Sequence, residues 1–205
     1  MVGAEAKDKD MTEPANSMTL MDAINTRRSV RAFGPQKVEK AVINSLLAAA
    51  VRAPTARHEE PWTFAIVQDV ALLQRLSDRA KSMMTEEAHR AHHDDGGHSR
   101  DVLSRPGFNI FYNANTLIAI CAKSPGPFAF ADCWLAAENL MLAACAFGLG
   151  SCVIGSAIPV LNNDEIKLEL GISTEISVVA PIIVGVPVDT GLQSARQTPI
   201  ILGWK

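Results

Sequence analysis

The chain has 205 residues, of which 48% are hydrophobic, 20% charged and 5% aromatic. This composition is typical of a globular protein, and the length suits a single domain. With 19 Lys and Arg against 22 Asp and Glu, the formal net charge is −3, which disfavours a dedicated nucleic-acid-binding protein because such proteins are more often basic.

The four cysteines all lie in apolar stretches and form no C-x-x-C pair. Their number and spacing do not suit a disulfide scaffold, a structural zinc site or thioredoxin chemistry. We therefore expect reduced core thiols of a cytoplasmic protein at Cys121, Cys133, Cys145 and Cys152.

Residues 1–17 are polar and rich in small side chains, without the apolar segment of a secretory signal peptide. We interpret them as a disordered leader, so that the folded domain is expected at residues 18–205. The uncharged stretch 139–158 contains three glycines, which indicate a helix end followed by a second element. We therefore expect no membrane span there.

The first half of the chain predicts three helices and a strand. Thr19 and Asp22 form a capping-box pattern at the start of a short helix. Apolar side chains at helical spacing predict an amphipathic helix at residues 38–51, and the aromatic and β-branched residues 62–68 predict a strand. Asp69 can cap the next helix. The apolar face of that helix comprises Leu72, Leu73, Leu76, Ala80 and Met83.

Residues 86–107 are polar, hold four of the five histidines and show no periodicity, so we expect a variable lid loop there. Residues 116–121 predict a buried strand. Residues 131–147 form a long helix that is apolar around nearly its whole circumference. Such a helix must be buried on all sides, which suggests that a second subunit covers part of it.

The last third alternates strands and helices irregularly. We expect a short strand at residues 151–155, a helix at 163–171, and a strand at 175–186 that Pro181 should kink or place at a sheet edge. Residues 190–205 form a C-terminal arm whose apolar patch needs a surface to dock on. This order favours an α+β sandwich over a regular βαβ series.

Standard motifs for nucleophilic, phosphate-binding and metalloprotease chemistry are absent, since there is no G-x-S-x-G, no G-x-x-x-x-G-K-[ST] and no H-E-x-x-H. The first candidate site is Arg27-Arg28-Ser29-Val30-Arg31, with three guanidinium groups and a hydroxyl next to a helix end. This cluster could bind a phosphate through charge-assisted hydrogen bonds. The alternative is a solvated basic turn whose arginines complement the helix C-terminus.

The second candidate site is the polar loop A-P-T-A-R-H-E-E-P-W, between a predicted helix and a predicted strand. Two prolines bracket the loop, which can present Thr55 and backbone groups to a flat ligand. The alternative is an ordinary helix-to-strand connection.

Four segments occur in a fixed order: R-R-S-V-R-A-F, A-P-T-A-x-x-x-x-P-W-T-F, A-D-C-W-L-A-A-E-N-L-M-L-A-A-x-A-F-G-L-G-S and P-I-I-V-G-V-P. With these segments the chain resembles the FMN-dependent nitroreductase family over residues 18–187. The resemblance implies an α+β sandwich with a central, mostly antiparallel sheet flanked by helices, and a homodimer with FMN at the subunit interface. It also implies an oxidoreductase in which NAD(P)H reduces the flavin, which then reduces a nitroaromatic, quinone or similar small acceptor in a ping-pong reaction. No catalytic side chain is implied, because the flavin carries the chemistry.

The resemblance further implies roles for individual residues. The FMN phosphate and ribityl chain would be held by Arg27, Arg28, Ser29 and Arg31, with a last phosphate contact from Arg196. The isoalloxazine would lie against Pro54, Thr55 and His58 of the polar loop and along the backbone of Val153, Ile154 and Gly155.

The polar loop departs from the family pattern A-P-S-x-x-N-x-Q-P-W at two positions, because His58 replaces an asparagine and Glu60 replaces a glutamine. A neutral histidine donates through one ring nitrogen and accepts through the other. A glutamate would repel a reduced flavin unless it is protonated or paired with Arg57. These departures leave open an alternative function, a flavin-binding sensor or storage protein without turnover.

The histidines between residues 86 and 98 allow a third reading, a metal site, since His89 and His93 are one helical turn apart. We favour a lid that selects the substrate, because Gly96 and Gly97 argue against a rigid site.

Overall fold

The computed structural model describes residues 18–91, 107–189 and 196–205, and the side chains of all of these except 87–91. The predicted disordered leader and residues 92–106 of the predicted lid lie outside the described residues.

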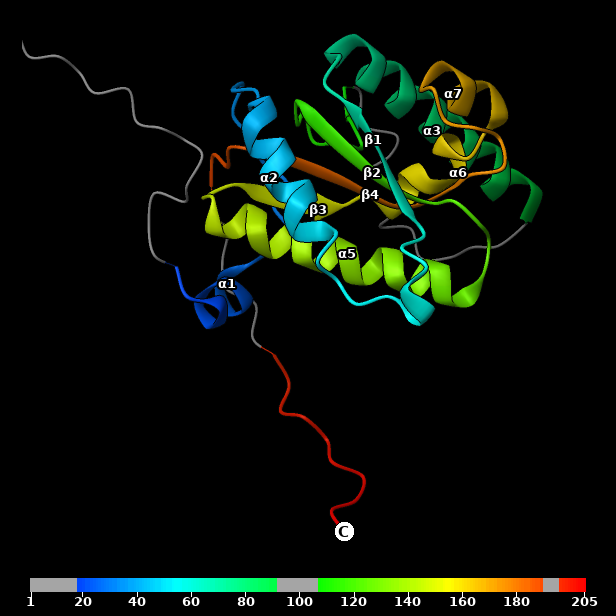
Figure 1. Ribbon diagram of the computed structural model, residues 1–205. Coiled ribbons are helices and arrows are strands. Elements are labelled where there is room, and N and C mark those ends of the chain that lie inside the picture. The colour runs from blue at the N-terminus through cyan, green and yellow to red at the C-terminus, as the bar shows by residue number, and fades with distance from the viewer. Residues whose placement is uncertain (1–17, 92–106, 190–195) are drawn as a thin grey trace, which may run out of the picture.

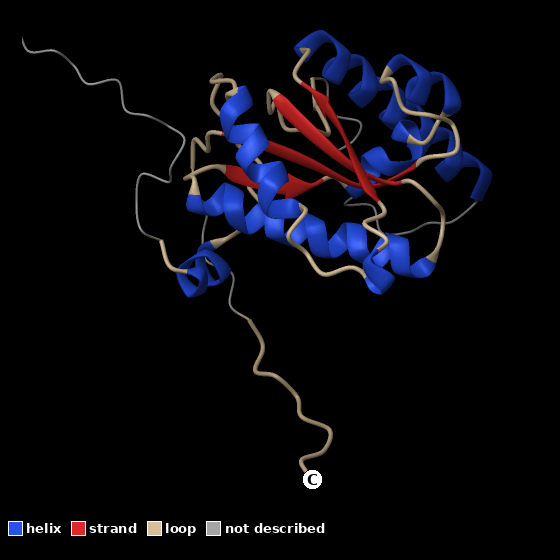
Figure 2. Cartoon of the chain, in the orientation of Figure 1, coloured by secondary structure: helices blue, strands red, loops and turns tan. Residues whose placement is uncertain are grey.

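The centre of the fold is a four-stranded sheet in which every pair of neighbouring strands is antiparallel (Figure 2). In spatial order the strands are β1 (Trp62–Val67), β2 (Thr116–Ala122), β4 (Ser177–Gly185) and β3 (Gly150–Val153). All residues of β2 are buried, as expected for an apolar central strand with helices on both faces. The predicted α+β sandwich with an antiparallel sheet is confirmed.

One face of the sheet is covered by α2 (Lys40–Ala50) and α5 (Pro127–Ala146) (Figure 1). Alternation along β2 explains the two layers, since Ile118 and Ile120 point into this core cluster. The short helix α1 (Leu20–Thr26) packs against α5, and the predicted capping box between Thr19 and Asp22 is present.

The other face is covered by α3 (Val70–Ala91) and α6 (Ile158–Leu161), with α7 (Asp164–Glu169) beside α6. Leu117 and Ala119 of β2 point into this second core cluster. Asp69 caps α3 as predicted, because its carboxylate accepts from the backbone N–H groups of the first turn. Figure 1 shows the two helical layers on opposite sides of the sheet.

Pro181 does not lie at a sheet edge, so this part of the prediction is wrong. β4 runs between β2 and β3, and Pro181 pairs with Ala119. The Pro181 carbonyl accepts from Ile154 N–H at 2.9 Å, so the proline nitrogen faces the same side of β4, just past the last β3 pair, Val153 with Ile182. The ladder needs no donor at that position, which is why a proline is tolerated in this central strand.

Several element boundaries differ from the prediction. α3 continues to Ala91, so the segment predicted as a lid from residue 86 begins as helix. α5 begins at Pro127 and not at residue 131, because proline is well tolerated in the first turn of a helix. The residues after β3 form a 3-10 turn, η2 (Gly155–Ala157), followed by α6, a helix that the sequence analysis did not predict.

Helix α5 is buried on one face only. Phe128 and Trp134 are 65% and 43% exposed, and Leu135 and Phe130 are exposed as well. By length and composition the helix could cross a membrane, yet a core helix has the same properties, and α5 covers a sheet. Its exposed apolar face is the surface that the sequence analysis expects a second subunit to cover.

The C-terminal arm runs away from the body of the chain (Figure 1). Its apolar side chains are exposed, with Leu202 at 98% and Trp204 at 88%. The arm therefore finds no docking surface in the described part of its own chain.

The four cysteines are free thiols, as predicted. Burial raises the pKa of Cys121 to about 12 and that of Cys133 to about 11. These two thiols are inert core residues at neutral pH. Cys145 is only half-buried.

Candidate functional site

The arginine segment, residues 27–31, leaves the end of α1 in an extended conformation and docks along one end of the sheet. Val30 N–H donates to the Ser151 carbonyl at 3.0 Å, and Ser29 pairs with Ser151 as a parallel bridge. Further along, Gly34 N–H donates to the Val186 carbonyl at 2.9 Å. These backbone bonds fix the segment against the start of β3 and the end of β4.

Two glycines make this docking possible. A Cβ at Gly150 would lie 2.8 Å from three carbon atoms of Val30, and a Cβ at Gly185 would lie 2.9 Å from the ring of Phe33. Any larger residue at either position would push the segment away from the sheet.

A cavity of about 350 Å³ lies beside the arginine segment. Its lining includes Thr26, Arg27, Arg28, Cys145, Ser151 and Pro187. Both guanidiniums are held in place, because Arg27 Nε is 3.4 Å from Glu138 Oε1 and Arg28 Nη1 donates to the Thr26 carbonyl at 2.7 Å. A guanidinium has five N–H donors, so most of them remain available to a ligand in the cavity.

Cys152 of β3 lies near side chains of the arginine segment. Burial raises the pKa of its thiol, and the positive charges of Arg31 and Arg27 act in the opposite direction. The Ser29 side chain lowers the same pKa through a hydrogen bond. The structure thus brings together Arg27, Ser29 and Arg31, which the sequence analysis grouped, around β3. Arg27 and Arg28 are half-buried, which disagrees with a fully solvated turn, whereas Ser29 and Arg31 are exposed.

The chain reaches the surface directly after β3, at Gly155. Val153 is half-buried, Ile154 is buried and Gly155 is exposed. A Cβ built at Gly155 meets no atom within 4 Å, so a flat group could approach the main chain there. The predicted segment 153–155 follows Ser151, the residue that pairs with Ser29 of the arginine segment.

The polar loop is strained. Arg57, His58 and Glu60 have φ values of 57°, 56° and 45°, in the left-handed region that side chains other than glycine and asparagine rarely adopt. Such residues cost of order 1–3 kcal/mol each and persist where the surrounding structure holds them. Within the loop Thr55 is half-buried, and Pro54 and His58 are exposed.

Asp132 of α5 holds this loop. Its carboxylate is only 5% exposed, and its two oxygens accept from Ala56 N–H at 3.2 and 3.1 Å. Sequence analysis missed this role, although Asp132 is one of only two carboxylates in this mostly apolar helix, the other being Glu138.

The two candidate sites lie at opposite ends of α5 within one chain. α1 contacts the C-terminal end, where Thr26 Oγ1 is 3.5 Å from Cys145 Sγ, whereas the loop contacts Asp132 near the other end (Figure 1). The 13 residue steps from Asp132 to Cys145 span about 20 Å of helix axis at 1.5 Å per residue. One chain alone therefore does not bring Thr55 and His58 to the arginine segment.

Arg196 is exposed at the start of the C-terminal arm. Its predicted contact with a phosphate stays a prediction.

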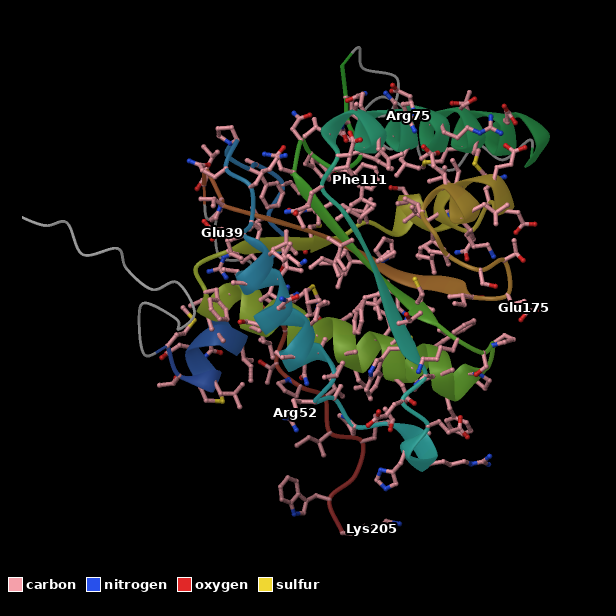
Figure 3. All side chains as sticks on the ribbon, turned by 45° about the horizontal axis from the view of Figure 1, so that its top comes forward. Glu39, Arg52, Arg75, Phe111, Glu175 and Lys205 are labelled. Atoms are coloured by element: carbon pink, nitrogen blue, oxygen red, sulfur yellow. The ribbon has the colours of Figure 1, made fainter. Side chains whose placement is uncertain are left out.

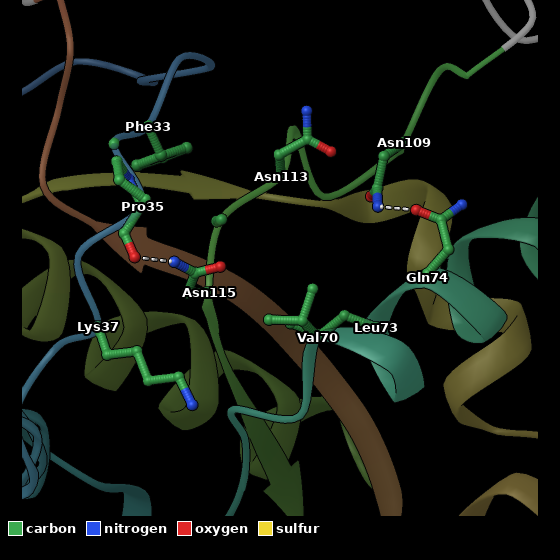
Figure 4. Close-up of a pocket in the computed structure, with 11 residues that line it drawn as sticks. Phe33, Pro35, Lys37, Val70, Leu73, Gln74, Asn109, Asn113 and Asn115 are labelled. Carbon is green, nitrogen blue, oxygen red and sulfur yellow. Dashed lines mark hydrogen bonds between the residues drawn. The ribbon is translucent and has the colours of Figure 1, made fainter.

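A second cavity, of about 470 Å³, lies between the chain segment 33–37, the start of α3 and the loop that precedes β2 (Figure 4). Its amide side chains are engaged with the protein: Asn109 Nδ2 donates to Gln74 Oε1 at 2.8 Å, and Asn115 Nδ2 donates to the Pro35 carbonyl at 2.7 Å. These bonds shape the loop that precedes β2.

Within residues 18–91, 107–189 and 196–205 no three His, Cys, Asp or Glu side chains gather as metal ligands do. Most of the histidine-rich segment lies outside these ranges, and the metal hypothesis for it stays untested.

Comparison with known proteins shows the family. The model of the Nitroreductase family matches residues 24–186, and the chain therefore belongs to this family. A protein of Archaeoglobus fulgidus, provisionally named NADH dehydrogenase/NAD(P)H nitroreductase, is 28% identical over 171 residues, which cover 81% of this chain and 84% of that protein.

Comparison with solved structures finds the same fold. The nitroreductase of Bacteroides fragilis with bound FMN aligns with a TM-score of 0.72 and 27% identity, covering 90% of this chain and 95% of that one. Iodotyrosine deiodinase of Danio rerio is 42% identical over a shorter stretch of 55 residues, 27% of this chain and 19% of that protein.

The close approach of Val30 to β3 gives a first prediction. Gly150→Ala should lower the free energy of unfolding by about 1–3 kcal/mol, because the added methyl group overpacks the contact with Val30. Gly155→Ala is the matched control and should change stability by less than about 0.5 kcal/mol, since its Cβ meets open space. Denaturant unfolding of both variants measures the difference, and equal stabilities would show that the segment is not tightly docked.

The Asp132–Ala56 hydrogen bond gives a second prediction. Asp132→Ala should lower the free energy of unfolding by about 1–3 kcal/mol and speed hydrogen exchange of the Ala56 amide, because that amide loses its acceptor. Asp132→Asn keeps an acceptor oxygen and should show smaller changes in both measurements. Equal effects of the two substitutions would contradict the assigned bond.

Proposed function

We propose that this chain is an FMN-dependent oxidoreductase that takes reducing equivalents from NAD(P)H and passes them to a nitroaromatic, quinone or similar small acceptor in a ping-pong reaction. The observation that carries the proposal is the cavity of about 350 Å³ between the end of α1 and the start of β3, which half-buried Arg27 and Arg28 line. Membership of the Nitroreductase family and the likeness to an FMN-bound structure support it.

The donor set fits the phosphate end of FMN. Arg27 and Arg28 line the cavity, whereas Ser29 and Arg31 are exposed and lie beside Cys152 of β3. A phosphate bound where these groups meet would receive bidentate, charge-assisted hydrogen bonds from the arginines and a neutral one from the Ser29 hydroxyl. Their own partners on the protein use few of their N–H groups. The ribityl chain and the ring would extend from there past Val153 toward the exposed backbone of Gly155.

Bound FMN would supply the hydride and electron transfers, as flavins do in general. The protein then has to bind and orient the ring, and no nucleophile or charge relay is required of it. The absence of nucleophile motifs from the sequence agrees with this division of labour.

A homodimer would complete the site. In a closed two-fold pair whose α5 helices run antiparallel, the loop at the amino-terminal end of one α5 would face the arginine segment at the C-terminal end of the other. Pro54, Thr55 and His58 of the second chain would then reach the ring. The same arrangement would cover the exposed apolar face of α5, with Phe128 and Trp134.

His58 and Glu60 give this site its own character. Both are exposed, and both have left-handed backbone conformations. Asparagine adopts that conformation more readily than most residues, which gives a conformational reason for the asparagine of the family pattern at position 58. The carboxylate of Glu60 would repel the negative charge of a reduced flavin ring beside it. This repulsion is the reason to test the alternative function, flavin binding without turnover.

We place the protein in the cytoplasm, since its four cysteines are free thiols. We expect no nucleic-acid or membrane partner, and a single domain over residues 18–205.

The experiment that tests the function is an absorbance spectrum of the purified protein before and after NADH or NADPH is added without oxygen. We expect flavin bands near about 370 and 450 nm that bleach on addition of the reductant. Arg28→Ala combined with Arg31→Ala should lower FMN affinity at least tenfold, because two phosphate contacts are lost. Gln74→Ala, at the second cavity, is the control and should retain the flavin.

Three results would count against the proposal. Protein that stays colourless when FMN is added would contradict flavin binding altogether. Yellow protein that neither NADH nor NADPH bleaches would favour the sensor or storage function. Full FMN retention in the double arginine variant would remove the phosphate site.

A further inference from the structure

Left-handed backbone among the non-glycine residues of the described chain is confined to two loops. One is the polar loop, which the proposed function uses. The other precedes β2, where Tyr112 and Asn113 have φ values of 52° and 57° in succession. Strain of this kind persists only where the surroundings impose it, and it concentrates at binding sites.

The surroundings of the second loop do impose its shape. Phe111 is fully buried and anchors the loop against the sheet (Figure 3). Its N–H donates to Asn109 Oδ1 at 2.8 Å, and Ile110 N–H donates to Ser77 Oγ at 3.0 Å. The loop is therefore a rigid support, and the half-buried ring of Tyr112 projects from it.

That ring faces the arginine segment. The Arg31 guanidinium carbon lies 5.9 Å from the centroid of the Tyr112 ring, within the range of a cation–π contact. Phe108 also contacts the Tyr112 ring, in an edge-to-face arrangement with centroids 5.7 Å apart and an interplanar angle of 84°. Tyr112 is the single tyrosine of the chain.

The three arginines of the segment are held in three different ways. Arg27 is held by the carboxylate of Glu138 and Arg28 by the Thr26 carbonyl, and each of these contacts occupies N–H donors. Among the described residues Arg31 makes no ion pair, and its ring contact occupies no N–H group. Within the described part of the chain, no hydrogen bond engages the five N–H donors of Arg31, which can therefore bind an anion.

We infer that Tyr112 is a positioning residue that holds the Arg31 guanidinium for the phosphate group of the bound mononucleotide. The inference rests on the proposed function, since it takes FMN as the ligand. An aromatic face holds a planar guanidinium in place without using its N–H donors. A guanidinium that is already held in place loses less conformational entropy when it binds phosphate. The contact should therefore contribute to recognition of the phosphate and not to recognition of the flavin ring.

The test compares two ligands on the apoprotein, FMN and riboflavin, which differ only in the phosphate. Their affinities are measured by titration of flavin fluorescence. Tyr112→Leu should weaken FMN binding about three- to tenfold and leave riboflavin binding unchanged, whereas Tyr112→Phe keeps the ring and should restore FMN affinity to within about twofold. Tyr112→Met, a second variant without a ring, should behave like Tyr112→Leu if the leucine variant folds poorly.

Two controls separate the contact from the packing of the loop. Phe108→Leu removes an aromatic ring beside Tyr112 but no ring next to Arg31, so it should keep the ratio of FMN to riboflavin affinity within about twofold. In an Arg31→Gln background, Tyr112→Leu should have no further effect on FMN affinity, because the residue acts through Arg31.

Equal losses of FMN and riboflavin affinity in Tyr112→Leu would overturn the inference, because they would show a structural role alone. So would an undiminished FMN affinity in that variant, or an effect of Tyr112→Leu that persists in the Arg31→Gln background. In these cases the wild-type protein still binds FMN and the proposed function stands. If the wild-type apoprotein binds neither ligand, the proposed function and this inference both fail.

Discussion

Helix α5 is the constraint on which the rest of the structure depends. Its buried face covers the sheet. Its Cys145 contacts Thr26 at the end of α1, and its Glu138 pairs with Arg27 of the arginine segment. Its Asp132 accepts a hydrogen bond from the strained loop. Because a helix is rigid, α5 keeps the two candidate sites about 20 Å apart in one chain. Its opposite face exposes large apolar side chains. A second copy of the chain would cover that face and would bring the two sites together, which is why fold, assembly and proposed chemistry depend on the same helix.

The sequence predicted the elements whose determinants are local. The capping box at Thr19 and Asp22, the Asp69 cap and the periodicity of α2 each act within a few residues, and the structure confirms all three. The uninterrupted apolar run of β2 predicted a strand buried on both faces. The four ordered motifs predicted the family, which the match over residues 24–186 confirms. Arg27, Ser29 and Arg31, at alternate positions of an extended segment, all lie near Cys152, and their predicted role toward a phosphate stays a prediction.

Features that depend on contacts distant in the sequence were not predictable in the same way. Pro181 was expected to be kinked or at an edge, yet its strand is central, because the order of strands is set by packing. The proline nitrogen faces the position just past the end of β3, where the ladder needs no donor. The partners of Asp132 and Tyr112 lie 76 and 81 positions away in the chain, so no local pattern reveals them. The left-handed conformations of Arg57 and His58 are imposed by such contacts against the residues' own preferences.

In the proposed homodimer, each flavin site combines the arginine segment of one chain with the polar loop of the other. Mixed dimers test this directly, made by co-expressing a chain with Arg28→Ala and Arg31→Ala and a differently tagged chain with Thr55→Trp, which fills the space in front of the loop. Each variant alone should bind little FMN. The mixed dimer, isolated through both tags, should bind one FMN per two chains, because one of its two sites combines an intact arginine segment with an intact loop. A mixed dimer that binds no FMN would show that both halves of a site come from the same chain, and would contradict the account.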